Sequence, residues 1–119
     1  MSEHDTQVAF CEWCKWNEQK YPALKLAFAI PNGGKRHVGV AVKLKAEGVR
    51  AGIPDWCLPV PIGGYAGLWI EFKYDKNKLS DSQSDYIALL EKNGHCVDVC
   101  YSVEEAMCTA VEYLNGATK

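Results

Sequence analysis

Two adjacent glycines, Gly63 and Gly64, lie midway between two apolar, β-prone segments at 55–60 and 68–74. A Gly-Gly pair between such segments is a strong signal for a tight antiparallel hairpin. A hairpin folded about residue 63 places Asp55 opposite Glu71, because the two positions are equally far from the bend. This feature restricts the chain to folds that contain an antiparallel strand pair near their centre.

The second segment, "LWIEFKY", carries two charged residues, Glu71 and Lys73, in an otherwise apolar run. Side chains alternate across a strand, so these two share one face while Leu68, Ile70 and Phe72 take the other. Burying a charge is costly unless the charge is paired or bound to something. The pattern therefore indicates a site on one face of this strand.

The hairpin would bring the carboxylates of Asp55 and Glu71 together, with the ammonium of Lys73 beside them. Two such acids repel unless something positive lies between them, and oxygen-ligated Mg²⁺ is the hard cation expected there. Such a site holds a cation and a polarised water together, which favours a metal-dependent nuclease. The alternative is a surface Glu–Lys ion pair on a half-exposed strand, worth about 0–1 kcal/mol.

The remaining periodicities predict a mixed α/β fold in a single domain spanning residues 1–119. The expected order is α-β-α-β-β-α-β-α. Ser80 and Gln83 have the spacing of a capping box, and Ser2 fits an N-cap. On the first helix, apolar residues 8, 11, 13 and 16 are expected on or near one face. Helices are expected at 3–20, 37–48, 80–93 and 102–114, and strands at 24–30, 55–60, 68–74 and 96–101.

Net charge and hydropathy exclude two classes of protein. The formal net charge of −2 argues against a chain coated in positive charge. No apolar run approaches the roughly 20 residues of a membrane span. The first ten residues lack the basic and then apolar pattern of a secretion signal, so we expect a cytoplasmic protein without a membrane partner.

Positive charge is nevertheless concentrated between residues 35 and 50. Five bases against one acid, Glu47, leave a local excess of four positive charges. Such runs are usually solvated helix faces, and contact with an anionic partner is the other interpretation. The bases are Lys35, Arg36, Lys43, Lys45 and Arg50.

The chain has six cysteines, and Cys11 and Cys14 form a C-x-x-C. No second pair completes a zinc site, and no secretion signal supports a disulfide framework. We therefore expect the cysteines to act mainly as small buried apolar groups. A zinc or redox protein is the alternative.

Three segments carry a resemblance to a known family: "GIPD" (52–55), "IEFK" (70–73) and "SDSQ" (80–83). Together they resemble the stand-alone VRR-NUC domain of phages and bacteria, a branch of the PD-(D/E)xK nucleases. Glu3 and Gln7, and the segments 29–36, 44–55 and 94–97, also match this family in kind and order. The resemblance implies a restriction-endonuclease-like fold, phosphodiester hydrolysis in branched DNA such as Holliday junctions, and a homodimer.

The resemblance also implies roles for individual residues. Asp55 and Glu71 would bind Mg²⁺ or Mn²⁺ together with the backbone carbonyl of Phe72, whose side chain points into the core. Glu3 would bind the metal directly or through a water. Lys73 would orient or help deprotonate the attacking water and offset charge on the phosphate.

Other roles are open between alternatives. Gln83 is either the N3 residue of the capping box or a hydrogen-bond donor near Lys73 and the phosphate. The five bases between residues 35 and 50 are candidates for phosphate contacts, which position DNA without reading its sequence. Paired cuts in a two-fold symmetric junction need two sites, hence a symmetric dimer, for which the four tryptophans supply aromatic surface. The alternatives are a nicking or flap nuclease without junction preference, and a catalytically silent nucleic-acid-binding module.

Overall fold

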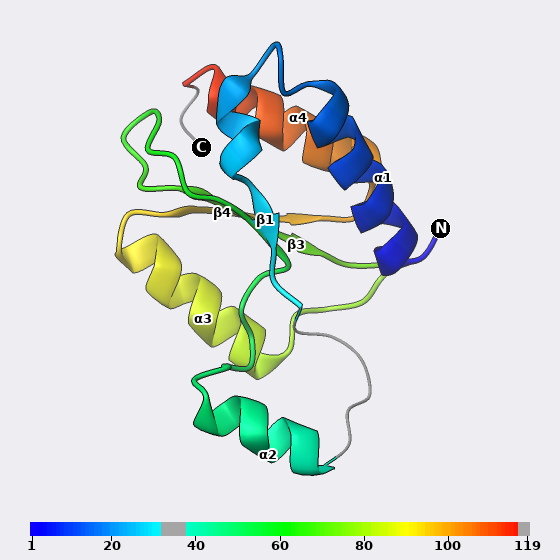
Figure 1. Cartoon of the computed structure of the whole chain (residues 1–119), viewed down its shortest axis with the longest axis vertical. Coiled ribbons are helices and arrows are strands. Elements are labelled where there is room, and N and C mark those ends of the chain that lie inside the picture. Colours follow the sequence, from blue (N-terminus) through cyan, green and yellow to red (C-terminus); the bar gives the residue numbers. More distant parts are fainter. Residues whose placement is uncertain (32–37, 117–119) are drawn as a thin grey trace.

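The computed structural model describes residues 1–31 and 38–116, and it shows a mixed α/β fold, as the sequence predicts (Figure 1). The order of helices and strands is also as predicted, with one additional 3₁₀ helix. The elements are α1 (Glu3–Trp16), η1 (Pro22–Leu26), β1 (Phe28–Ala29), α2 (Val38–Ala46), β2 (Trp56–Leu58), β3 (Leu68–Phe72), α3 (Asp81–Lys92), β4 (Cys96–Cys100) and α4 (Val103–Leu114).

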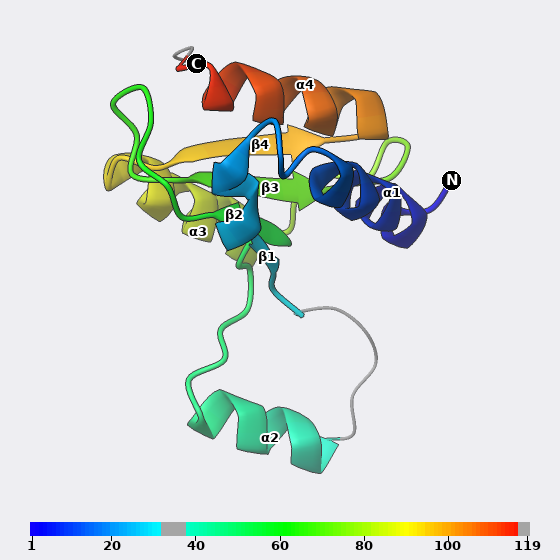
Figure 2. The same ribbon diagram turned by 45° about the horizontal axis from the view of Figure 1, so that its top comes forward.

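The strands form one mixed sheet in the order β1-β2-β3-β4. β1 and β2 pair antiparallel, β2 and β3 pair antiparallel, and β3 and β4 pair parallel. Helices α1 and α4 cover one face of this sheet and α3 covers the other (Figure 2). The parallel pair is possible because α3 carries the chain across the sheet between β3 and β4.

The predicted hairpin register is confirmed. Trp56 pairs with Ile70 and Leu58 pairs with Leu68. The bend at the two glycines is closed by a bridge between Ile62 and Tyr65. Both glycines have positive φ, 63° at Gly63 and 87° at Gly64, which explains why the sequence needs glycine at these positions.

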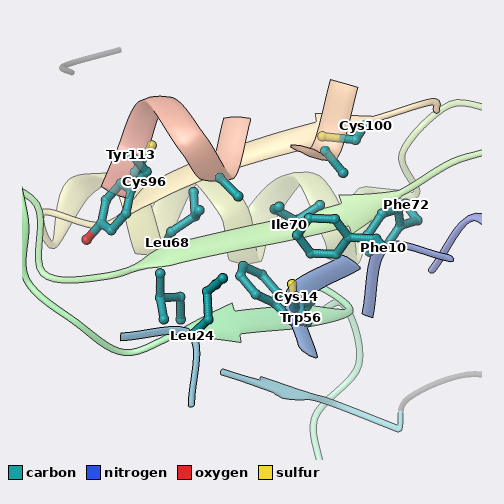
Figure 3. Packing of buried hydrophobic residues seen from close by; sticks show 13 residues of the cluster. Phe10, Cys14, Leu24, Trp56, Leu68, Ile70, Phe72, Cys96, Cys100 and Tyr113 are labelled. Carbon is teal, nitrogen blue, oxygen red and sulfur yellow. The ribbon is translucent and has the colours of Figure 1, made fainter. Parts of the chain in front are cut away.

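The hydrophobic core lies between the sheet and the α1–α4 layer (Figure 3). Leu68, Ile70 and Phe72 of β3 are fully buried in it, as their alternation predicts. The ring of Phe10 in α1 packs against Trp56 and Phe72, with centroid separations of 4.9 and 5.7 Å. Edge-to-face and tilted aromatic contacts of this kind stabilise a core beyond the area that they bury.

The predicted apolar face of α1 is correct only in part, because Cys11 and Trp13 pack against the core as partly buried residues. The residues that α1 buries are Thr6, Phe10 and Cys14, whereas Val8 and Trp16 are exposed, Trp16 by 86%. Phe10 packs against Trp56 in the core. Because residues four apart lie on the same face of a helix, this contact also turns Thr6 and Cys14 toward the core. The helix also ends at Trp16, earlier than the predicted 20, because Asn17 caps it by donating from its side chain to the carbonyl of Trp13.

The predicted strand at 24–30 is also wrong over most of its length. Pro22 starts the 3₁₀ helix η1, for which its fixed φ is suitable, and Leu24 is buried from this helix. Only Phe28 and Ala29 remain as the edge strand β1. The other helices begin and end within two residues of their predicted limits, and α2 is a helix despite its valines.

Four of the six cysteines are buried, as predicted, and all six are free thiols. Burial raises the pKa of Cys14 to about 12 and that of Cys57 to about 11, so both stay protonated and unreactive at neutral pH. Cys11 is partly buried and Cys108 is exposed. Among the described residues, no helix combines the length and the apolar character needed to cross a bilayer.

Candidate active site

The β2–β3 hairpin brings Asp55 and Glu71 to the same end of the strand pair, as its register predicts. Asp55 directly precedes β2, and its Oδ2 accepts a hydrogen bond of 2.8 Å from the backbone N–H of Phe72. The backbone carbonyl of Asp55 accepts another from the N–H of Ile30. The carboxylate is thus held by the main chain of the neighbouring strand, while the side chain of Phe72 lies in the core on the opposite face.

Glu71 is a buried acid, with only 3% of its surface exposed. Its Oε2 accepts a hydrogen bond of 3.1 Å from Nε2 of Gln83, in the first turn of α3. The same oxygen lies 3.9 Å from Nζ of Lys73, whose side chain is also largely buried. Glu71 therefore faces the start of α3, and Lys73 lies beside it on the same face of the strand.

Gln83 is the N3 residue of the capping box, the first of the two roles that the sequence leaves open, and it also donates to Glu71. A contact of Gln83 near Lys73 and the phosphate stays a prediction. Its Oε1 accepts from the backbone N–H of Ser80 at 2.9 Å, and its own N–H donates to the hydroxyl of Ser80, which completes the capping box. Its Nε2 remains free for Glu71. One side chain thus fixes the start of α3 and orients the acid.

The electrostatics of the two acids are unfavourable to full ionisation. Burial, chiefly, and the charge of Asp55 raise the pKa of Glu71 to about 8, against the opposing effect of Lys73. Burial also raises the pKa of Asp55, opposed mainly by the hydrogen bond from Phe72. A buried acid and a half-buried acid beside one lysine lack positive charge, so a divalent cation between them would be stabilised.

The donor set fits a hard cation. Mg²⁺ is usually held by one or two carboxylates and keeps several waters. Asp55 and Glu71 supply such a pair. Within residues 1–31 and 38–116, no three His, Cys, Asp or Glu side chains gather closely enough to hold a metal ion, so neither a third acid nor the C-x-x-C forms a protein-only cage.

Glu3 lies toward the same region from the start of α1. Its negative charge contributes to the raised pKa of both Asp55 and Glu71. Its Oε2 accepts a hydrogen bond of 3.4 Å from the side chain of Asn77. Direct binding of a metal by Glu3 stays a prediction, as does binding by the carbonyl of Phe72.

The predicted phosphate contacts fall into two groups. Lys43 and Lys45 lie on α2 and Arg50 follows it, and all three are exposed. Lys35 and Arg36 lie outside the described residues. The sequence reasoning missed Lys76 and Lys78, two further exposed bases in the loop that connects the site strand β3 to α3.

Gly52 and Asn77 are the other residues that sequence reasoning missed. Gly52 has φ of 87°, and a Cβ there would lie 2.3 Å from the carbonyl oxygen of Ser82, in the first turn of α3. The loop before Asp55 therefore sits directly on the helix that carries Gln83. The sequence signal was the glycine itself, just before "IPD".

The backbone carbonyl of Asn77 accepts a hydrogen bond from the hydroxyl of Tyr101, which ties the loop after β3 to the β4 end.

Comparisons with known proteins agree with the fold and identify the family. The family model described as the VRR-NUC domain matches residues 1–104. The chain is 28% identical over 99 residues to the Fanconi-associated nuclease 1 homolog of Schizosaccharomyces pombe; the match covers 83% of this chain and 14% of that protein. A solved structure titled VRR_NUC domain protein superposes with a TM-score of 0.82 at 26% identity, over 100% of this chain and 97% of that one.

Proposed function

Because the chain belongs to the VRR-NUC family of nuclease domains, we propose that it cleaves DNA by metal-dependent hydrolysis of phosphodiester bonds at Asp55 and Glu71. One observation carries the metal dependence. The buried Glu71 and the half-buried Asp55 lie together with raised pKa values, and among the described residues Lys73 is the base that offsets their charge. A bound Mg²⁺ or Mn²⁺ would remove this imbalance.

The metal would polarise the phosphoryl oxygen and lower the pKa of a bound water. The chain's own groups would do the rest. The N–H of Phe72 keeps the carboxylate of Asp55 in one orientation, and Gln83 does the same for Glu71. Lys73, on the same face as Glu71, would orient the attacking water and offset charge on the phosphate. The 3′ oxygen would leave and the product would carry a 5′-phosphate.

We propose branched DNA as the preferred substrate and a homodimer as the active form. Paired cuts in a four-way junction require two sites related by two-fold symmetry, and the acids described here supply one site per chain. A nicking or flap nuclease without junction preference is the second candidate, since a single site suffices for it. A DNA substrate is consistent with the cytoplasmic location that the sequence predicts.

Exposed bases would hold the phosphate backbone. Lys43, Lys45 and Arg50 are exposed, and Lys35 and Arg36 complete the proposed set. Each contact of this kind releases counterions, so each should add to the salt dependence of binding. Reversing Lys43 and Lys45 to Glu should weaken binding of all DNA shapes and reduce the salt slope by about two.

A catalytically silent binding module is disfavoured by the same acids. Keeping the buried carboxylate of Glu71 beside that of Asp55 destabilises a fold, and a module that only binds DNA gains nothing from it. A cation bound between the carboxylates of Asp55 and Glu71 would explain why the two lie so close together. Their presence next to an intact Lys73 therefore favours an enzyme.

The test is cleavage of labelled four-way junction, flap and linear duplex in Mg²⁺, Mn²⁺ or EDTA. Asp55→Asn keeps an oxygen for the N–H of Phe72 but removes the charge, and Lys73→Ala removes the amine. Each should lower the cleavage rate by at least about 10²-fold while DNA binding remains. Lys92→Ala, an exposed lysine at the far end of α3, is the control and should cleave normally. Cleavage in EDTA, or a fully active Asp55→Asn protein, would refute the proposal.

A further inference from the structure

Tyr101 is an exposed aromatic residue directly beside the candidate active site. The last paired residues of β3 and β4 are Phe72 and Cys100, and the N–H of Lys73 donates to the carbonyl of Cys100, which carries the pairing one residue further. Tyr101 therefore lies across from Lys73 on the neighbouring strand, with the two backbones about 4.8 Å apart. The side chain of Cys100 is fully buried in the core, so alternation directs that of Tyr101 to the other face, where the site lies.

The ring of Tyr101 is held in place although 42% of the residue is exposed. Its hydroxyl donates a hydrogen bond of 3.1 Å to the backbone carbonyl of Asn77. Its backbone N–H donates to the carboxylate of Glu105 at 3.2 Å. The side chain is therefore fixed at both ends before a substrate arrives. An aromatic surface that is already ordered loses little conformational entropy when a ligand binds to it.

The loop that accepts this hydroxyl begins with a closed turn. The N–H of Asn77 donates to the carbonyl of Tyr74 at 3.0 Å, and Asp75 has a φ of 53°, a left-handed conformation that Asp tolerates better than most residues. The side chain of Asn77 donates to Glu3 at the start of α1. Both views of the ribbon place the loop beside this end of α1 (Figure 1 and Figure 2). The loop and Tyr101 therefore form one ordered edge of the site.

The charges around the ring separate a place for phosphate from a place for a neutral group. Lys76 and Lys78 are exposed on the loop that binds the hydroxyl of Tyr101. Glu104 and Glu105 are exposed in the first turn of α4, which follows Tyr101 in the chain. A phosphate is attracted by the lysines and repelled by the glutamates. An uncharged nucleobase can lie on the ring between them.

We propose that Tyr101 is a stacking surface for an unpaired nucleobase next to the phosphate that is cleaved. Proteins bind single-stranded nucleic acid through aromatic faces beside basic residues that contact the backbone, which is the combination at this edge of the site. Lys76 and Lys78 would contact phosphates adjacent to the cut, and the base would turn toward Tyr101. Such a subsite accepts a nucleotide of any sequence, because every base has a face that can stack.

A fully paired duplex is a poor ligand for this subsite. Its bases stack on one another, so a base must be unpaired and unstacked before it can reach Tyr101. At a flap the base is already unpaired, and the cost of moving it onto the ring is smaller. The inference rests on the proposed function and makes its substrate more specific. Branched DNA would be selected through a base that reaches Tyr101, in addition to any effect of two-fold symmetry.

The alternative is a structural role, in which Tyr101 only holds the loop through its hydroxyl. Tyr101→Phe and Tyr101→Ala separate the two roles, because Phe keeps the ring and loses the bond to Asn77. A stacking role requires that the Phe variant binds flap DNA within about threefold of wild type, while the Ala variant binds about tenfold more weakly or worse. Equal losses of affinity in the two variants would show a structural role and overturn the inference.

Fluorescence of 2-aminopurine locates the stacked base. The probe replaces one base at a time in the unpaired strand of a flap, starting at the branch, and binding is measured in EDTA so that the proposed hydrolysis does not occur. At one position near the branch, wild type and Tyr101→Phe should quench the probe, and Tyr101→Ala should not. The matched control is Trp16→Ala, which removes an exposed aromatic roughly 20 Å along α1 from Glu3 and should behave like wild type.

Far-UV circular dichroism and the melting temperature establish that each variant is folded. If Tyr101→Ala does not fold, Tyr101→Leu takes its place, because Leu keeps apolar bulk and has no aromatic face. The same loss of quenching is expected. A Leu variant that quenches the probe like wild type would overturn the inference.

A flap with an abasic site at the responding position completes the test. The abasic site should weaken binding by wild type about tenfold and binding by Tyr101→Ala less than about twofold, because the variant has already lost the partner of that base. If no position responds, or if the abasic site weakens binding by both proteins equally, the inference is wrong. None of these measurements needs cleavage. A protein that stacks the base but never cuts DNA in Mg²⁺ or Mn²⁺ would therefore refute the proposed nuclease and leave the stacking surface established.

Discussion

The β2–β3 hairpin and helix α2 both depart from the usual distribution of residues, in which polar groups are exposed and apolar groups are buried. The hairpin buries a polar group, and α2 exposes apolar ones. The hairpin buries the carboxylate of Glu71, whereas α2 exposes Val38 and Val42. Each arrangement is unfavourable for the isolated chain, and each becomes favourable with a partner of the right chemistry. A cation is the partner that we propose for the two acids, whereas nothing in the described chain covers the valines.

The two regions also differ in how firmly they are held. Asp55 is fixed by the N–H of Phe72, and Glu71 by Gln83, whose other amide atom caps α3. No comparable contacts hold α2 within the described chain, since none of its residues is buried. Substitutions near the site should therefore change the stability of the whole protein, and substitutions in α2 should not.

The largest effect is expected at Gly52. Gly52→Ala introduces a Cβ 2.3 Å from the carbonyl oxygen of Ser82 at a φ of 87°, so both overpacking and backbone strain apply. We expect a loss of about 3 kcal/mol in the free energy of unfolding, measured in urea, and reduced cleavage. Gly64→Ala is the matched control, because it has the same φ and no atom within 4 Å. It should lose only the strain, about 1 kcal/mol. Equal losses would show that the contact with α3 is unimportant.

The next largest effect is a pH dependence caused by Glu71. Its pKa is about 8 in the folded protein and near the ordinary value of 4.5 when unfolded. Between these values only the folded state holds the proton, so the free energy of unfolding should fall as pH rises from about 4.5 to 8 and then level off. In EDTA we expect a change on the order of 2 kcal/mol after allowing for solvent screening.

Urea titrations at several pH values measure this dependence. Glu71→Gln lacks the titrating group and is the control, so it should lose most of the slope. Saturating Mg²⁺ should also reduce the slope, because a cation favours the ionised acid. A wild-type protein that becomes more stable over this pH range would contradict the raised pKa.

A smaller effect is expected at Gln83, where two substitutions separate its two contacts. Gln83→Ala removes both the capping interaction and the donor to Glu71, and should cost about 1 kcal/mol of stability. Gln83→Glu keeps an oxygen for the N–H of Ser80 but places a negative charge beside Glu71. It should retain the start of α3, seen by hydrogen exchange, and raise the pKa of Glu71 further. If both variants behave alike, the contact with Glu71 has no separate effect.

The smallest effect is expected in α2. Gly39→Ala meets no atom within 4 Å and should favour the helix locally by about 1 kcal/mol. Hydrogen exchange of the α2 amides should slow about fivefold, while the free energy of unfolding of the sheet changes by less than about 0.5 kcal/mol. The reverse exchange in a packed helix, Ala110→Gly in α4, should cost at least about 1 kcal/mol, because Ala110 is fully buried. A large global effect of Gly39→Ala would mean that α2 is coupled to the body.

Much of the site was predictable because its geometry follows from short-range signals. The Gly63–Gly64 bend sets the register, and the register sets Asp55 beside Glu71. The capping box at Ser80 and Gln83 was predictable for the same reason. Contacts between distant segments were not: nothing local indicates that Gly52 packs against Ser82 or that Asn77 approaches Glu3.

The errors in the fold have the same origin. A strand at 24–30 was predicted from β-prone residues, but Pro22 and the burial of Leu24 favour a 3₁₀ turn. The apolar face of α1 is predicted only in part because apolar residues surround that helix, and the position of Phe10 against Trp56 selects among them. The exposure of α2 could not be predicted, since its composition is that of a core helix.

The antiparallel pairing of Trp56 with Ile70 has a consequence for quality control of the protein. If β2 and β3 paired with a register shifted by one residue, the strands would still be hydrogen-bonded. The side chains of one strand, however, would point to the opposite face of the sheet. Such a misfolded molecule would be compact and inert, with one acid facing the α1–α4 layer. The fraction of molecules that cleave DNA would then equal the fraction in which β2 and β3 pair in the native register. A melting curve does not measure that fraction.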